Sequence, residues 1–158
     1  MRVLIDTNIL LDYLTNREPY TDAASQIMMA CKYRTIKGCM AAHSVLNLFF
    51  ILRHDYTVAE RRTMLKALFK ALSVAKIDRK NLLSALSNES FRDFEDCVQS
   101  NCAVSYHADY IITRNEKDFT GSPIPCIAPD VFCREYLNPH ENVPKQQAEQ
   151  GKTPLETP

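Results

Sequence analysis

Glycine is scarce in this chain: Gly38, Gly121 and Gly151 are the only three among 158 residues. None of them belongs to a G-x-G-x-x-G or G-x-x-x-x-G-K-[ST] pattern. Those patterns form the loops that hold dinucleotides and nucleoside triphosphates, because only glycine lets the backbone approach the phosphates closely. The sequence therefore excludes dinucleotide-binding enzymes of the Rossmann type and P-loop phosphotransferases.

Excess charge and long apolar runs are also missing. The 19 Lys and Arg balance the 19 Asp and Glu, so we expect no broadly basic surface for nucleic acid, although a local patch remains open. No apolar run approaches about 18 residues, and the N-terminus lacks a long apolar stretch, so we expect no membrane span and no signal peptide. The six cysteines form no C-x-x-C pair, which is typical of reduced, buried thiols in a cytoplasmic protein.

Apolar residues make up 46% of the chain, and strand-like segments alternate with helix-like ones. We expect strands at residues 2–5, 36–41, 74–77, 110–113 and around Ile127. We expect helices at residues 8–15, from Thr21, 42–53, after Thr57, after Asp78, 93–107 and 130–137. This alternation predicts an α/β fold, a single domain over residues 1–137 with a central, mainly parallel sheet flanked by helices. Residues 138–158 are polar, contain four prolines and are expected to form a tail.

Several helix starts and one buried helix are predicted from local patterns. Thr57 and Glu60 form a T-x-x-E capping box, and Thr21 and Asp78 can cap the helices that follow them. Residues 42–53 are apolar nearly all round, which is typical of a helix buried on every side. The inward face of the helix after Thr57 is expected to comprise Leu65, Leu68, Phe69 and Leu72.

A carboxylate comes directly after the first expected strand. Asp6, Thr7 and Asn8 follow Arg2–Ile5 and precede an apolar pattern that suits a helix. An Asp at the carboxyl end of a strand lies at the edge where open α/β sheets hold their ligands. Because a buried carboxylate is costly unless it is paired or holds a cation, Asp6 is either a metal ligand or the partner of another charge.

Two further acids lie one turn apart in the expected helix 93–107. Asp93 and Asp96 share one stripe of that helix, where like charges repel each other by about 0.2–0.5 kcal/mol. One interpretation is that acids near a helix N-terminus interact favourably with the helix dipole, which suits Asp93 better than Asp96. The other is that a hard divalent cation such as Mg²⁺ offsets the repulsion. The spacing leaves both interpretations open.

The strand near residue 112 repeats the opening pattern. It is followed by Thr113, Arg114 and Asn115, and then by Asp118. Two parallel strands that deliver such groups to one edge would bring Asp6 and Asn115 together. Capping of the next turn explains Thr113 and Asn115 equally well. Arg114 suits either a phosphate or a surface salt bridge.

Three segments in this order, MRVLIDTNILLDYL, DFEDCVQSNCA and ADYIITRNEKDF, resemble the PIN domain. This nuclease fold is found in toxin subunits of bacterial toxin–antitoxin pairs and in RNA-processing factors. The resemblance covers roughly residues 1–137. It implies a metal-dependent endoribonuclease with an acidic pocket that binds Mg²⁺ or Mn²⁺ and cleaves RNA to a 5′-phosphate and a 3′-hydroxyl.

The resemblance also assigns roles to individual residues. By similarity, Asp6 is the first acidic ligand, Asp96 is the acid of the later helix, and Asn115 is the residue after the fourth strand. Asp93 and Asp118 are additional acids beside the pocket and at its rim. The catalytic set is thus Asp6, Asp93, Asp96 and Asn115, the metal set is Asp6, Asp93, Asp96 and Asp118, and the supporting set is Asn8, Asn47, Thr113 and Arg114.

Asn47 is a departure from the family pattern, which usually has Glu in the helix after the second strand. A buried amide without a partner costs about 1–3 kcal/mol, so Asn47 is expected either to face the pocket or to bond the backbone. The loss of one charge leaves two functions open: a metal-dependent ribonuclease, or an inactive PIN module that binds RNA or a protein. The implied partners are RNA, an antitoxin protein and a second copy of the chain.

Overall fold

A computed structural model describes residues 1–139, and these fold around one five-stranded sheet in which all strand pairs are parallel. The strand order is β3-β2-β1-β4-β5. The strands are β1 (Arg2–Ile5), β2 (Lys37–Ala41), β3 (Ser73–Ala75), β4 (Tyr110–Ile112) and β5 (Cys126–Ile127). The predicted α/β fold with a parallel sheet is confirmed. The expected tail from residue 138 lies almost wholly outside the described residues.

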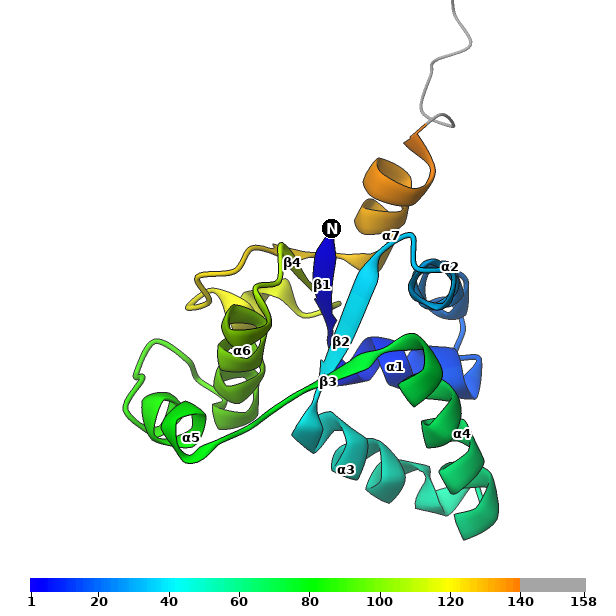
Figure 1. The fold of residues 1–158 in the computed structure, drawn as a ribbon, viewed down its shortest axis with the longest axis horizontal. Coiled ribbons are helices and arrows are strands. Elements are labelled where there is room, and N and C mark those ends of the chain that lie inside the picture. The colour runs from blue at the N-terminus through cyan, green and yellow to red at the C-terminus, as the bar shows by residue number, and fades with distance from the viewer. Residues whose placement is uncertain (140–158) are drawn as a thin grey trace, which may run out of the picture.

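Helices cover both faces of the sheet (Figure 1). One face carries α5 and α6, and the other carries α1, α2, α4 and α7, while α3 continues from the end of β2. The helices are α1 (Thr7–Thr15), α2 (Thr21–Lys32), α3 (Ala42–Ile51), α4 (Val58–Ala71), α5 (Arg79–Leu86), α6 (Phe94–Tyr106) and α7 (Pro129–Phe132), with short turns η1 (Leu52–His54), η2 (Glu116–Phe119) and η3 (Cys133–Leu137).

The alternation of side chains along β1 divides the core into two layers. Val3 and Ile5 pack in the cluster under α1, α2 and α4, whereas Leu4 packs in the cluster under α6. All three are fully buried. Because both faces of the sheet are covered, the buried part of the strand, Val3 to Ile5, is apolar, and the next polar side chain, Asp6, appears only where the strand ends.

The local helix signals are mostly confirmed. The Thr57–Glu60 capping box begins α4, and Asp78 caps α5 in a second capping box with Asn81. The prediction for Thr21 is wrong: Thr21 is the first residue of α2, and its N-cap is Tyr20, which makes no side-chain capping bond. The helical backbone at Tyr20 follows a turn, in which its N–H donates to Arg17, so no capping side chain is needed to start α2.

The prediction that residues 42–53 form a helix buried on every side is wrong. Leu46 and Phe50 of α3 are 72% and 61% exposed. The helix packs on the rest of the domain through its other face, where Ser44 and Leu48 are buried. The apolar sequence of residues 42–53 correctly predicts a helix, but it does not show whether the apolar side chains are covered by the protein's own core.

The prediction for Phe69 of α4 is also wrong, because this side chain is exposed and not inward, while Leu65, Leu68 and Leu72 are buried as expected.

All six cysteines are free thiols, five of them buried and Cys126 half-buried, as their apolar surroundings predict. Burial raises the pKa of Cys31 and Cys39 to about 12, which makes these thiols poor nucleophiles and metal ligands. Within residues 1–139 there is no helix that is both long and apolar enough to cross a membrane.

Candidate active site

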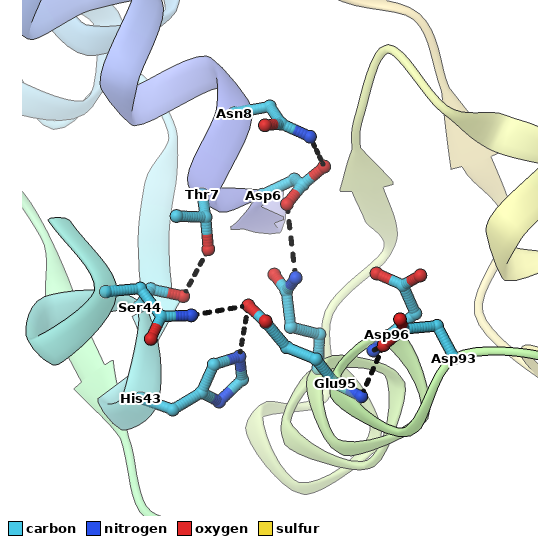
Figure 2. A network of polar contacts seen from close by, with 10 residues as sticks. Asp6, Thr7, Asn8, His43, Ser44, Asp93, Glu95 and Asp96 are labelled. Carbon is cyan, nitrogen blue, oxygen red and sulfur yellow. Dashed lines mark hydrogen bonds and ion pairs between the residues drawn. The ribbon is translucent and has the colours of Figure 1, made fainter. Parts of the chain in front are cut away.

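Asp6 stands where β1 ends and α1 begins, and its carboxylate is held from three sides. Gln99 Nε2 donates to Oδ1 at 3.1 Å, and Thr113 Oγ1 donates to Oδ2 at 2.8 Å. Asn8 Nδ2 makes a longer contact to Oδ2 at 3.5 Å (Figure 2). The residue is only 3% exposed. These neutral donors stabilise a buried carboxylate in one orientation, and they link β1, α6 and the end of β4.

Asp93 and Asp96 lie at the N-terminus of α6. Asp93 is the N-cap, and its Oδ1 accepts from the backbone N–H of Glu95 at 2.7 Å and of Asp96 at 3.4 Å. The capping interpretation of Asp93 is therefore confirmed. It does not apply to Asp96, whose carboxylate has no hydrogen-bond partner within residues 1–139.

The carboxyl group of Asp96 is strongly affected by the acids around it. Burial, followed by the negative charges of Asp93, Asp6 and Asp118, raises the pKa of Asp96 from its ordinary 3.8 to about 7. The charge of Glu95 contributes in the same direction. The acids that the sequence placed on three separate segments are thus close enough to perturb one carboxyl group. A positive charge at this point would relieve their repulsion.

The segment after β4 is positioned by Thr113. Its hydroxyl donates to Asp6 and accepts from the backbone N–H of Asn115 at 3.0 Å, so it serves the site and the turn together. Asn115 and Asp118 begin and line the short η2 turn, where the backbone N–H of Asp118 donates to the carbonyl of Asn115 at 2.9 Å. Both residues are exposed, and the charge of Asp118 acts on Asp96.

Asn47 bonds neither the backbone nor Asp6. Its Nδ2 donates to Glu95 Oε1 at 2.8 Å, and His43 Nε2 lies 3.3 Å from the same oxygen. Figure 2 shows Glu95 reaching from α6 toward His43 on α3. The neighbouring His43, together with Asn47, lowers the pKa of Glu95 and keeps it charged. Glu95 of α6 thus places a carboxylate between α6 and α3, in contact with both Asn47 and His43.

A second contact fixes α3 against the start of α1. Thr7 Oγ1 donates to Ser44 Oγ at 2.8 Å, and both residues are buried (Figure 2). The residue after Asp6 therefore anchors the helix that carries His43 and Asn47. This bond couples the position of the Asn47–Glu95 pair to the strand end that carries Asp6.

Arg114 points to a different partner from the acids of the cluster. Its Nε lies 3.0 Å from Oδ2 of Asp12, a carboxylate that is 0% exposed. The guanidinium also lies over the ring of Tyr20, 4.0 Å from its centroid. The salt bridge predicted as one alternative for Arg114 is therefore present, but its partner is a buried acid of α1 rather than a surface charge. Burial still raises the pKa of Asp12, although the charges of Arg114 and Arg17 act in the opposite direction.

Sequence reasoning missed three residues of this region: Asp12, Glu95 and Gln99. Asp12 interrupts an apolar helix pattern, and a carboxylate on such a stripe is a signal that a cation lies opposite it. Gln99 lies one turn after Asp96, a spacing that places both on one side of α6. Glu95 gives no comparable local signal, because its partner Asn47 is 48 positions away in the sequence.

The geometry defines a parallel α/β domain with carboxylates gathered at the carboxyl edge of its sheet. Residues 2–117 match the family model of the PIN domain, and the chain belongs to that family. PIN domains are in general nucleases that depend on a divalent metal. A comparison with curated proteins finds no match.

Solved structures share this fold at low sequence identity. The chain resembles a structure of VapBC2 from Rickettsia felis bound to a promoter DNA fragment, with a TM-score of 0.61, 14% identity and coverage of 81% of this chain and 98% of that one. It resembles a toxin–antitoxin complex from Klebsiella pneumoniae, with a TM-score of 0.58, 22% identity and coverage of 80% and 97%. VapBC-1 from nontypeable Haemophilus influenzae gives a TM-score of 0.59, 17% identity and coverage of 82% and 99%.

Asp6, Asp93, Asp96 and Asp118 form an acidic edge, and their carboxylate oxygens are ligands that suit a hard divalent cation. The buried Oε1 of Gln99 is a further oxygen, and it has no hydrogen-bond partner in the described part of the chain. Within residues 1–139, no three His, Cys, Asp or Glu side chains are grouped closely enough to hold a metal by themselves. This arrangement fits Mg²⁺ or Mn²⁺, which are commonly bound by one or two carboxylates and several waters.

Proposed function

We propose that the chain is a metal-dependent endoribonuclease whose site is the acidic edge formed by Asp6, Asp96, Asp93 and Asp118, with Asn115 at the rim. The observation that carries the proposal is that the buried carboxylate of Asp6, held by Gln99 and Thr113, lies at the same edge as the acidic N-terminus of α6. The raised pKa of Asp96, to which burial and four neighbouring carboxylates contribute, agrees with this clustering. Where carboxylates repel one another in this way, a bound cation lowers the electrostatic free energy of the site. Asp6 and Asp96 would hold the Mg²⁺ or Mn²⁺.

The chemistry divides between the ion and the side chains. When bound, Mg²⁺ or Mn²⁺ neutralises phosphate oxygens and makes a water molecule more acidic. Gln99 and Thr113 hold the Asp6 carboxylate in a fixed orientation. Asn115 is placed to donate a hydrogen bond to the substrate at the rim. We propose that Glu95, fixed by Asn47, supplies the negative charge that the family usually carries on the helix equivalent to α3.

A cleavage assay tests this function. Labelled single-stranded RNA is incubated with the full chain in Mn²⁺, in Mg²⁺ and in EDTA, and the product ends are identified. The proposal predicts cleavage in metal, none in EDTA, and 5′-phosphate and 3′-hydroxyl ends. Cleavage that persists in EDTA, or that survives Asp96→Asn, would contradict it.

One observation favours the second function, a PIN module that binds without cleaving. Within residues 1–139, no three His, Cys, Asp or Glu side chains are grouped closely enough to hold a metal, and Asn47, at the position where we expect the family acid, adds no charge. RNA binding without any cleavage in Mn²⁺ would support this function over the first. The two proposals share the fold and differ in whether the acidic edge binds a cation.

We also propose a protein partner for α3. Its side chains Leu46 and Phe50 are largely exposed, and an apolar helix face of this kind is typical of an interface. The structural relatives include toxin–antitoxin complexes, which supports an antitoxin as the partner, with a second copy of the chain as the other candidate. Size-exclusion chromatography of the chain, alone and with a co-expressed neighbouring gene product, separates these two.

A further inference from the structure

A cavity of about 480 Å³ opens beside the acidic edge. Its walls come from three places: Pro19 and Tyr20 before α2, Arg114 and Asn115 after β4, and Asp130 at the start of α7. The volume lies within the range of sites for small molecules, about 300–1,000 Å³. Asn115, which the proposed function places at the rim of the acidic edge, also lines this cavity. A ligand that fills it therefore adjoins that edge.

Arg114 is held in this cavity by contacts that leave part of its guanidinium free. Its Nε faces the buried Asp12 at 3.0 Å, and its plane lies over Tyr20 at 4.0 Å. The terminal nitrogens donate no hydrogen bond within residues 1–139, and the side chain keeps 21% of its exposure. The two terminal NH₂ groups are therefore available to an anion, and the contacts with Asp12 and Tyr20 reduce the side-chain entropy lost on binding.

We propose that this cavity binds the nucleotide next to the cleaved bond, with its phosphate on Arg114 and its base beside Tyr20. The inference rests on the proposed function, because it takes single-stranded RNA as the substrate. Single-stranded RNA is commonly recognised by aromatic rings and Arg planes, and here the Arg114 guanidinium carbon lies over the Tyr20 ring, 4.0 Å from its centroid. The substrate strand would pass from the acidic edge to the cavity across Asn115.

Asp130 gives this subsite a base preference. A carboxylate repels a phosphate but accepts hydrogen bonds from the amino group of a base. Asp130 lines the same cavity as Arg114, so with the phosphate on Arg114 we expect the base to lie beside Asp130. The cavity is therefore expected to favour a base with an exocyclic amino group over uracil at this one position.

Binding is measured by fluorescence anisotropy with the full chain and a fluorescein-labelled 12-nucleotide single-stranded RNA in EDTA, so that cleavage plays no part. Arg114→Gln alone would leave Asp12 buried without its cation, so the variant used is Asp12→Asn combined with Arg114→Gln. We expect its Kd to rise about tenfold and the salt dependence of binding to fall by about one counterion. Tyr20→Ala is expected to raise Kd about fivefold to tenfold, and Tyr20→Phe to leave it unchanged.

Arg79→Gln, on α5 at the other face of the sheet, is the matched control and should bind like the wild type. Wild-type binding with unchanged affinity in both the Asp12/Arg114 and Tyr20 variants would overturn the subsite while leaving the proposed function intact. Competition by an acidic peptide of equal charge as strong as that by RNA would also overturn it. A wild type that neither binds nor cleaves RNA would contradict the proposed function, and the subsite with it.

Discussion

Glu95 of α6 accepts a hydrogen bond from Asn47 of α3, with 2.8 Å between Oε1 and Nδ2. This contact joins the two helices at the acidic edge and satisfies an amide that would otherwise be costly to cover. It also places the carboxylate of Glu95 beside the position at which we propose that the family acid is replaced by Asn47. The pair is therefore a point where the charge of the site and the packing of the fold can be tested separately.

Glu95→Gln separates charge from packing, because the new amide oxygen can still accept from Asn47. If Glu95 supplies charge to the cation site, the variant should bind Mn²⁺ about tenfold more weakly, while its melting temperature in EDTA changes little. Calorimetry and thermal melting measure the two effects. Glu135→Gln, an exposed acid on η3, is the matched control. Unchanged Mn²⁺ affinity would make Glu95 a packing residue only.

Asn47→Glu should destabilise the metal-free protein by about 2 kcal/mol, because it replaces a hydrogen bond with two facing carboxylates. Adding Glu95→Asn to it moves the carboxylate from α6 to α3 and restores an amide–carboxylate pair. The double variant is expected to be more stable than Asn47→Glu and to bind Mn²⁺ as the wild type does. Urea unfolding in EDTA measures the stability, and its increase in Mn²⁺ reports the binding. A double variant less stable than either single one would show that the helices do not tolerate the exchange.

Asp96→Asn should abolish RNA cleavage and stabilise the metal-free protein at neutral pH. Since the pKa of Asp96 is raised from 3.8 to about 7 in the folded chain, ionisation costs stability as pH rises through this window. Below about pH 4 both states are protonated and the penalty is absent. The advantage of the variant should therefore grow from near zero at pH 4 to about 1–2 kcal/mol at pH 7.5, after allowance for solvent screening. Melting in EDTA across this range measures it; a pH-independent difference would count against the assignment.

Arg114→Gln should destabilise the protein by about 3 kcal/mol, because it leaves the carboxylate of Asp12 buried without a cation. Asp12→Asn in the same chain removes that charge and should recover most of the loss. Denaturant unfolding of both single variants and the double variant gives the coupling energy. Additive losses would mean that the 3.0 Å contact contributes little to stability.

Gly38→Ala should destabilise the fold by about 2–3 kcal/mol through overpacking. A Cβ on this residue of β2 would lie 2.6 Å from both Cys31 Sγ and Leu72 Cδ2. Gly121→Ala is the milder comparison, since its nearest contact, Phe91, is at 3.0 Å on the surface loop. Equal melting temperatures for the two variants would contradict the tight approach of α2 and α4 to the sheet.

The sequence predicted the fold because the strands and helices carry regular apolar periods. It also placed Asp6 and Asn115 at one edge, since parallel strands end together, while Asp96 of α6 was assigned to that edge only by the resemblance to the PIN domain. It could not predict that α3 exposes Leu46, because an apolar helix has the same sequence pattern whether it packs in the core of its own chain or against another molecule. The Asn47–Glu95 pair was equally hidden, since a contact between distant helices leaves no mark on local spacing.

Titration of the metal-free chain with Mn²⁺ by isothermal calorimetry, alongside Asp6→Asn and Asp96→Asn, measures whether the acidic edge around Asp96 binds a divalent cation. We expect a saturable heat in the wild type and its loss in both variants, each of which should remain folded in EDTA. No saturable heat in the wild type, or equal heats in all three proteins, would contradict this expectation.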